Sequence, residues 1–150
     1  MKKLFLGLLL AIACTFVFGQ KLSTHQVPAA VISTFNTKFP GVSKVMWEKE
    51  KINYEAGFLL DGAKTSSTFD RSGKWLETET EIKATDLPTA VHQSLKKDFA
   101  DYKVNETARI ERATDGLCFE AEVEKGGEKY DLLFTPDGKK LSQTKVDKED

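Results

Sequence analysis

The chain has 150 residues, with 22 basic and 23 acidic side chains and a formal net charge of −1. This balance excludes the basic patch or stripe that is typical of nucleic-acid-binding proteins. It also leaves no polybasic run that would bind a lipid surface.

The N-terminal residues are typical of a secretory signal peptide. Lys2 and Lys3 precede an apolar run over residues 4–18. This run is shorter than the roughly 20 residues that span a bilayer, and it ends at the small residue Gly19. We expect cleavage after Gly19 and export of Gram-negative type to a periplasmic or secreted location, with no stable membrane span after signal removal. Two alternatives remain open, an uncleaved anchor and a lipoprotein processed at Cys14.

Removal of residues 1–19 leaves residues 20–150, about 130 residues, which suffice for one domain or for two very small ones that share a core. Cys118 is then the only cysteine, so no intramolecular disulfide can form. We expect Cys118 to be either a partly exposed thiol or a small residue buried where two units meet, with a slight preference for burial.

An amphipathic helix begins each half of the chain, after a polar lead-in over residues 21–26 in the first half. Apolar residues recur at helical spacing in both halves: Val27, Val31, Phe35 and Phe39 in the first, and Leu87, Val91, Leu95 and Phe99 in the second. Pro28 and Pro88 suit the first turn of a helix. Pro40 and Gly41 end the first helix.

A β-meander follows each helix, because residues 54–77 recur as residues 119–142. The two copies share Glu55/Glu120, Ala56/Ala121, Gly62/Gly127, Lys64/Lys129, Phe69/Phe134, Gly73/Gly138, Lys74/Lys139 and Leu76/Leu141. First strands are expected over residues 43–49 and about 106–113. Apolar and polar residues alternate over residues 52–60 and 117–124, which indicates strands with one buried face. Asp61-Gly62 and Gly126-Gly127 predict two-residue hairpin turns.

The predicted fold class is therefore α+β, with two tandem units of one helix and a four-stranded antiparallel meander. The first repeat covers residues 20–84 and the second covers residues 85–150. A unit of some 60 residues buries little apolar surface alone, so we expect the two repeats to pack as one body.

The repeated pattern resembles the PepSY-like family of exported bacterial proteins, which is described as similar in fold to the β-lactamase inhibitor protein. The resemblance is carried by the Pro-x-Ala-Val helix start, the Phe-Pro-Gly helix end, the Tyr/Phe-Glu-Ala strand and the Phe-Asp-x-x-Gly turn. The second copy departs from this pattern at Ala100-Asp101 and at Thr135-Pro136. The resemblance implies two helix-plus-sheet units whose exposed sheet faces form one surface for a protein or peptide ligand. It also implies that the ligand could be a hydrolase that the protein inhibits.

The sequence predicts no enzyme and no cofactor. His25 and His92 are the only histidines, and we interpret both as solvated residues near helix starts. Asp70 and Asp137 each have only a turn glycine nearby, so we interpret them as hairpin residues and not as ligands of a calcium loop. No phosphate loop, cysteine pair or zinc motif is present, and no metal site is predicted.

Apolar side chains on the wet sheet faces point to a binding surface. If Phe58, Phe69 and Leu76 face the helix, strict alternation turns Trp75 and Leu59 away from it, and Leu133 likewise in the second repeat. Exposed apolar clusters mark interfaces, and Trp is enriched at binding hot spots. The alternative is that the two repeats pack against each other there and bury Trp75 and Leu59. For Trp47, which lies near Val45, we expect a place in the core.

We therefore expect a non-enzymatic exported protein, a monomer or weak dimer, that binds a protein or peptide partner through its outward sheet faces. The predicted partner-binding residues are Leu59, Trp75, Glu77, Glu55 and Leu133. The alternative is a protein for a small ligand or divalent ion, which would use two rows of carboxylates: Glu77, Glu79 and Glu81, and Glu120, Glu122 and Glu124. These rows are also consistent with an ordinary solvated face balanced by nearby lysines.

Overall fold

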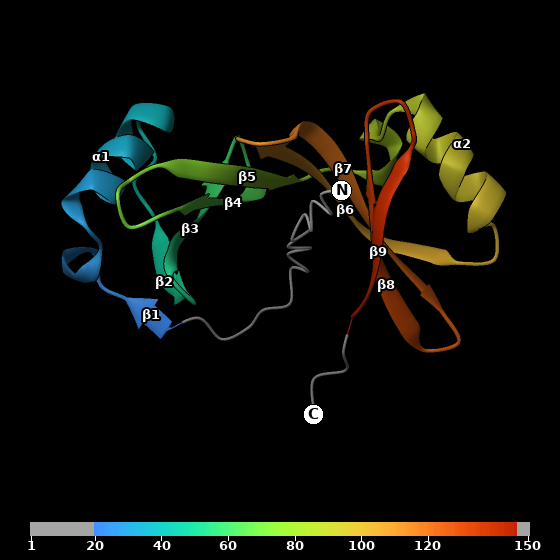
Figure 1. Cartoon of the computed structure of the whole chain (residues 1–150), viewed down its shortest axis with the longest axis horizontal. Helices are drawn as coiled ribbons and strands as arrows, with labels where there is room; N and C mark the ends of the chain where they lie inside the picture. Colours follow the sequence, from blue (N-terminus) through green and yellow to red (C-terminus); the bar gives the residue numbers. More distant parts are fainter. Residues whose placement is uncertain (1–19, 147–150) are drawn as a thin grey trace, which may run out of the picture.

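The computed structural model describes residues 20–146 (Figure 1). The predictions about residues 1–19, which include the signal peptide and Cys14, lie outside the described residues.

One antiparallel sheet of nine strands runs through both repeats in chain order. Its strands are β1 (Gln20–Leu22), β2 (Met46–Glu50), β3 (Asn53–Leu60), β4 (Ala63–Phe69), β5 (Trp75–Glu81), β6 (Lys103–Arg112), β7 (Gly116–Lys125), β8 (Glu128–Phe134) and β9 (Lys140–Val146). Helix α1 (Ala29–Lys38) lies between β1 and β2 in the chain, and helix α2 (Thr89–Asp98) between β5 and β6. Short 3-10 turns, η1 (Thr24–Gln26) and η2 (Ala84–Asp86), precede the helices. The α+β prediction is confirmed.

Strand β1 was not expected, because its residues lie where the sequence predicts a polar lead-in. It pairs with β2 from Gln20 opposite Lys49 to Leu22 opposite Trp47. Three residues are too few to show an alternation that would reveal a strand, although Leu22 packs against the core under α1. The first strands are also displaced by a few residues from their expected bounds, to 46–50 and 103–112.

The two repeats share one sheet because the last strand of the first pairs with the first strand of the second. Strand β5 pairs antiparallel with β6, from Glu77 opposite Arg112 to Glu81 opposite Ala108. Beyond the ladder, the Ile82 amide donates a hydrogen bond of 3.0 Å to the Thr107 carbonyl, and the Thr107 hydroxyl donates one of 2.8 Å to the Ile82 carbonyl. The sheet therefore continues across the boundary between the repeats.

Each helix covers a separate apolar core on the sheet. In the first core, Val31 and Phe35 of α1 pack on strand residues Trp47, Tyr54, Ala56, Phe58 and Phe69. In the second core, Val91 and Leu95 of α2 pack on strand residues Phe119, Ala121, Val123, Leu132 and Phe134. The predicted alternation of β3 and β7 and the core position of Trp47 are confirmed. Ile52, in contrast, is 80% exposed because it lies in the β2–β3 turn and not in the strand.

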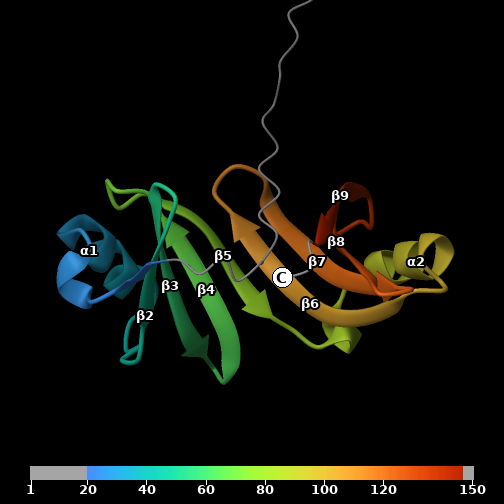
Figure 2. The ribbon, with the colours of Figure 1, turned by 90° about the horizontal axis from the view of Figure 1, so that it is seen from below.

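Both helices pack on the same face of the sheet. The strand register places Ala56 opposite Ser67, Ser67 opposite Thr78, Thr78 opposite Glu111 and Glu111 opposite Leu117. Ala56 belongs to the core under α1, and Leu117 packs against the core under α2. Yet the helices lie at opposite ends of the molecule (Figures 1 and 2). The sheet therefore twists and curves, so that its helix-bearing face turns outward at both ends.

The β4–β5 turn contacts α1 and the β8–β9 turn contacts α2, in each case through a glycine. Gly73 and Gly138 have φ angles of 85° and 84°, which favour glycine. A Cβ atom on Gly73 would lie 2.6 Å from the carbonyl oxygen of Ala30 in α1, and Gly138 approaches Ala90 of α2 in the same way. Ser94 also donates a hydrogen bond of 2.6 Å to the Gly138 carbonyl. The identical glycines of the two repeats thus hold each meander against its helix.

Candidate functional site

The sheet face opposite the helices is the candidate site, and we call it the inner face. Cross-strand partners define it through the middle of the molecule: Glu48, Glu55, Thr68, Glu77 and Arg112 in one row, Met46, Gly57, Ser66, Glu79, Ile110 and Cys118 in the next, and Leu59, Lys64, Glu81, Ala108, Glu120 and Leu133 in a third. Four of the five predicted partner-binding residues, Leu59, Glu55, Glu77 and Leu133, lie on this face.

Trp75 lies on the helix-bearing face, so its predicted orientation is wrong. It packs half-buried against the core under α1, and the Lys38 ammonium of α1 lies 3.9 Å from the centroid of its ring. Its indole N–H donates a hydrogen bond of 2.9 Å to Thr78. The cause is a register shift between Thr68 and Phe69, which places Trp75 opposite Phe69. An extra residue at such a bulge reverses the alternation from that point.

Leu133 faces away from α2 as expected, but it is not exposed. Only 5% of its surface is accessible, and it belongs to a small cluster with Ala108, Ile110 and Cys118. Alternation distinguishes the two faces of a strand, whereas the curvature of a sheet decides whether a helix-free face is open. Cys118 is buried in the same cluster, as the sequence favoured, and burial raises the pKa of its thiol.

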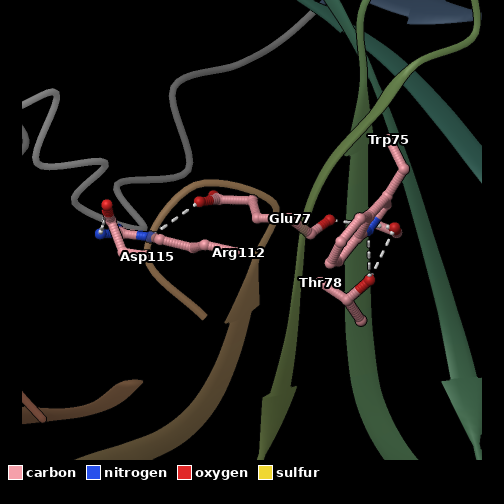
Figure 3. Close-up of polar contacts among 6 residues, drawn as sticks. Trp75, Glu77, Thr78, Arg112 and Asp115 are labelled. Carbon is pink, nitrogen blue, oxygen red and sulfur yellow. Dashed lines mark hydrogen bonds and ion pairs between the residues drawn. The ribbon is translucent and has the colours of Figure 1, made fainter. Parts of the chain in front are cut away.

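An ion pair crosses the inner face where the two repeats meet. The Arg112 Nε atom of β6 lies 3.2 Å from the Glu77 carboxylate of β5, and Arg112 also lies 3.9 Å from Asp115. Figure 3 shows Glu77 reaching toward Arg112, with Trp75 and Thr78 together on the other side. Burial raises the pKa of Glu77, and the Arg112 charge opposes this rise. The ion pair therefore offsets part of the desolvation of the Glu77 carboxylate.

Glu55 lies beside further carboxylates on the first half of the inner face. It is directly opposite Glu48 in β2. Burial raises the pKa of Glu55 to about 7, and the charges of Glu50, Glu48, Glu79 and Glu77 add to this rise. Glu55 therefore exchanges its proton near neutral pH.

Glu120 and Asp131 extend the carboxylates into the second half. Burial raises the pKa of Glu120 to about 9, with smaller contributions from neighbouring charges that include Glu79 and Asp131. Burial likewise raises the pKa of Asp131 to about 6. Near pH 7, Glu120 is therefore protonated and can donate a hydrogen bond, while the negative charge of the face lies on its neighbours.

The far end of the inner face is internally paired. Glu122 contacts Lys129 at 2.9 Å, and Asn105 donates hydrogen bonds to both Glu122 and Glu124. These contacts satisfy the carboxylates within the protein. Two members of the row Glu120, Glu122 and Glu124 are thus paired with polar or basic neighbours, as in the alternative of an ordinary solvated face.

Met46 is a member of the inner face that the sequence analysis missed. It is 71% exposed, and it lies opposite Gly57 in the β2–β3 ladder. Leu59, two residues beyond Gly57 on the same strand, is 64% exposed. The alternation of Met46 with Trp47 would have revealed this orientation, since Trp47 is in the core. The first half of the inner face therefore carries two open apolar side chains.

The two histidines and the turn residue Asp70 lie outside the inner face. His25 and His92 are exposed, as expected. The Asp70 carboxylate accepts hydrogen bonds from the backbone amides of Ser72 and Lys74, which confirms its role in the turn. Within the described range, no three His, Cys, Asp or Glu side chains are placed to hold a metal ion. No helix in that range is long and apolar enough to cross a membrane.

A groove of about 660 Å³ lies at the junction of the repeats, between the β3–β4 turn and the β5–β6 connection. Charged groups of both signs line it, including Lys64, Glu81, Lys83 and Glu106. Lys64 and Glu81 form an ion pair of 3.6 Å there. This mixture favours no class of small ligand, whereas the inner face has a clear excess of carboxylates.

The family comparison matches both repeats. The model of the family described as "Putative beta-lactamase-inhibitor-like, PepSY-like" matches residues 17–58 and 54–141. The comparison with curated proteins found no match.

Solved structures from Bacteroides share the fold. A BLIP-like protein from Bacteroides fragilis is 28% identical, with a TM-score of 0.73 over 82% of this chain and 89% of that one. A DUF2874 family protein from Bacteroides ovatus is 25% identical, with a TM-score of 0.74 over 79% of this chain and 87% of the other. A protein from Bacteroides eggerthii, described as one of the "putative periplasmic proteins", is 24% identical, with a TM-score of 0.75 over 80% and 89%.

These similarities extend over most of the described chain and include both helix-plus-meander repeats. None of the names indicates a catalytic role. The chain belongs to the PepSY-like, β-lactamase-inhibitor-like family.

Proposed function

We propose that this protein is a non-enzymatic, exported binding protein that presents the inner face of its sheet to a protein or peptide partner. The observation that carries the proposal is the pair of open apolar side chains, Met46 and Leu59, on a sheet face that no helix covers. Exposed apolar side chains that gather on one face mark interaction sites more often than singly scattered ones do.

Location outside the cytoplasm is part of the same proposal. It is supported by the charged and apolar N-terminal residues, and a fold relative from Bacteroides eggerthii is described as periplasmic. The proposal includes an inhibitory role, in which the bound partner is an enzyme. This is supported by the similarity to a BLIP-like protein, named after the β-lactamase inhibitor protein, from Bacteroides fragilis.

A capture experiment with matched variants tests the proposal. The exported protein, Leu59→Ser and Ile52→Ser are each immobilised and exposed to an extract of the source cell envelope, and retained proteins are identified by mass spectrometry. Ile52 is the control because it is 80% exposed, apolar and located in the β2–β3 turn. We expect a partner that is lost with Leu59→Ser and kept with Ile52→Ser. Identical retention by all three proteins would contradict the proposed site.

A further inference from the structure

We infer that the inner face of β2–β5 docks a cationic partner segment, one in which lysine or arginine side chains flank an apolar side chain. Met46 and Leu59 would receive the apolar side chain, and the surrounding carboxylates would receive the cations. This inference rests on the proposed function and specifies the chemistry of the partner.

The apolar part of the surface is shaped by Gly57. A Cβ atom on Gly57 would lie 3.8 Å from Cε of Met46, so the Met46 side chain lies across the bare backbone of β3. Leu59 projects from the same face two residues farther along. Methionine is flexible and adapts to the shape of a partner. The two side chains thus form an adaptable apolar contact area at one end of the inner face.

Carboxylates from β2, β3 and β5 share the inner face with this apolar area. Glu48 and Glu50 come from β2, Glu55 from β3, and Glu79 and Glu81 from β5. Among the basic residues of β2–β5, Lys64 of β4 lies on the inner face and forms an ion pair of 3.6 Å with Glu81. Strand β1 places Lys21 beside Glu48. Acidic groups therefore outnumber basic ones around Met46 and Leu59.

One pair of these carboxylates, Glu48 and Glu55, is placed unfavourably for folding. Glu48 and Glu55 are direct cross-strand neighbours, and like charges in that position are destabilising. Lys49, which lies between Glu48 and Glu50 in the sequence, projects to the other face and cannot separate them on this one. A cationic partner would relieve this repulsion, so the cost in the free protein favours the bound state.

The raised pKa of Glu55 would make the binding of a cation depend on pH. Glu55 is faced by Glu48 and Glu50 from β2 and by Glu77 and Glu79 from β5, with Arg112 of β6 paired to Glu77; its β4 neighbour Thr68 carries no charge. With a pKa of about 7, Glu55 is partly protonated at neutral pH. A bound cation favours the charged carboxylate. We expect affinity for the cation to rise between pH 6 and pH 8.

Three synthetic peptides of equal length test the inference. The first carries leucine flanked by lysines, and the other two carry glutamate or serine in place of lysine. Binding to the exported protein is followed by fluorescence anisotropy. We expect the lysine peptide to bind about tenfold more tightly than the serine peptide, which is a difference resolvable in any such titration. The glutamate peptide should bind least.

Matched variants separate a defined site from diffuse attraction. Leu59→Ser and Glu55→Gln should each weaken lysine-peptide binding several-fold, and Glu55→Gln should flatten its pH dependence. Ile52→Ser and Glu111→Gln are the controls, since Ile52 lies in a turn and Glu111 projects from the helix-bearing face opposite Thr78. Equal binding of the three peptides would overturn the inference, and so would equal losses in Glu55→Gln and Glu111→Gln.

Failure of this inference is distinguishable from failure of the proposed function. If the lysine peptide shows no preference while Leu59→Ser still loses the captured partner, the cationic chemistry is wrong and the binding face stands. If Leu59→Ser keeps the captured partner, the binding face itself is wrong.

Discussion

Glu120 is a carboxyl group that folding partly removes from water. Its pKa rises from 4.5 to about 9, chiefly through burial and then through nearby carboxylates. Between these two values the folded protein binds a proton that the unfolded chain has released. Stability therefore falls as the pH rises through this window, by at most about 1.4 kcal/mol per pH unit.

Replacement of Glu120 by Gln tests this charge linkage. We expect Glu120→Gln to flatten the fall in unfolding free energy between pH 5 and pH 9, and to be more stable than the wild type at pH 9. Urea unfolding at pH 5, 7 and 9 measures the effect. Glu111→Gln is the control, because Glu111 forms a partly exposed ion pair with Arg109. Parallel pH profiles for wild type and Glu120→Gln would show that Glu120 is not buried as described.

Because Trp75 packs on the helix-bearing face, we expect it to contribute to stability and not to partner binding. Trp75→Ala removes a ring that packs under Lys38 and a hydrogen bond to Thr78. We expect a loss of about 2 to 3 kcal/mol in unfolding free energy, within the usual range for a truncated aromatic side chain that is partly buried. Partner binding by the folded variant should be unchanged. Unaltered stability together with lost binding would restore Trp75 to the binding surface.

At the scale of elements, the glycine turns fix each meander against its helix. Gly73→Ala adds a Cβ atom against the Ala30 carbonyl at a residue whose φ is 85°. Gly62 has the same φ, but open space surrounds it. Gly62→Ala should therefore cost about 1 kcal/mol for the backbone conformation alone, whereas Gly73→Ala should cost clearly more. Thermal unfolding of both variants measures the difference, and equal losses would mean that the turn does not contact α1 closely.

Prediction from sequence worked where residues repeat with a regular period or where a turn needs glycine. Tyr54, Ala56 and Phe58 alternate with polar residues, and they lie under α1 as expected. Alternation failed for Trp75 because the bulge beside Phe69 inserts a residue. The second repeat has a register shift at the equivalent place, between Leu133 and Phe134. A strict alternation of buried and exposed residues assumes that no residue is inserted in the strand, so the orientation of Trp75 could not be deduced from it.

The surface of the whole molecule was harder to predict than its strands. The sequence placed Leu59, Glu55 and Glu77 on a helix-free face, and the structure agrees. It could not distinguish exposed Leu59 from buried Leu133, because that difference depends on how nine strands twist and curve together. The raised pKa of Glu120 has the same origin, since burial is a property of the assembled sheet.

The continuous sheet predicts that the two repeats unfold together. Both tryptophans, Trp47 and Trp75, lie in the first repeat, so their fluorescence reports that repeat alone. Far-ultraviolet circular dichroism reports strands and helices of both. Because β5 and β6 pair directly, we expect the two signals to give the same urea midpoint. Two separate midpoints would show that the repeats are independent domains.

Binding of the partner to the inner face can be tested residue by residue with NMR, through the amide signals that change when the partner binds. The ¹⁵N-labelled exported protein is titrated with the captured partner, and changes in amide signals are followed. We expect the largest changes in β2, β3 and β5, around Met46, Glu55 and Leu59. Changes centred on α1, α2 or the edge strand β9, with those inner-face signals unmoved, would contradict this expectation.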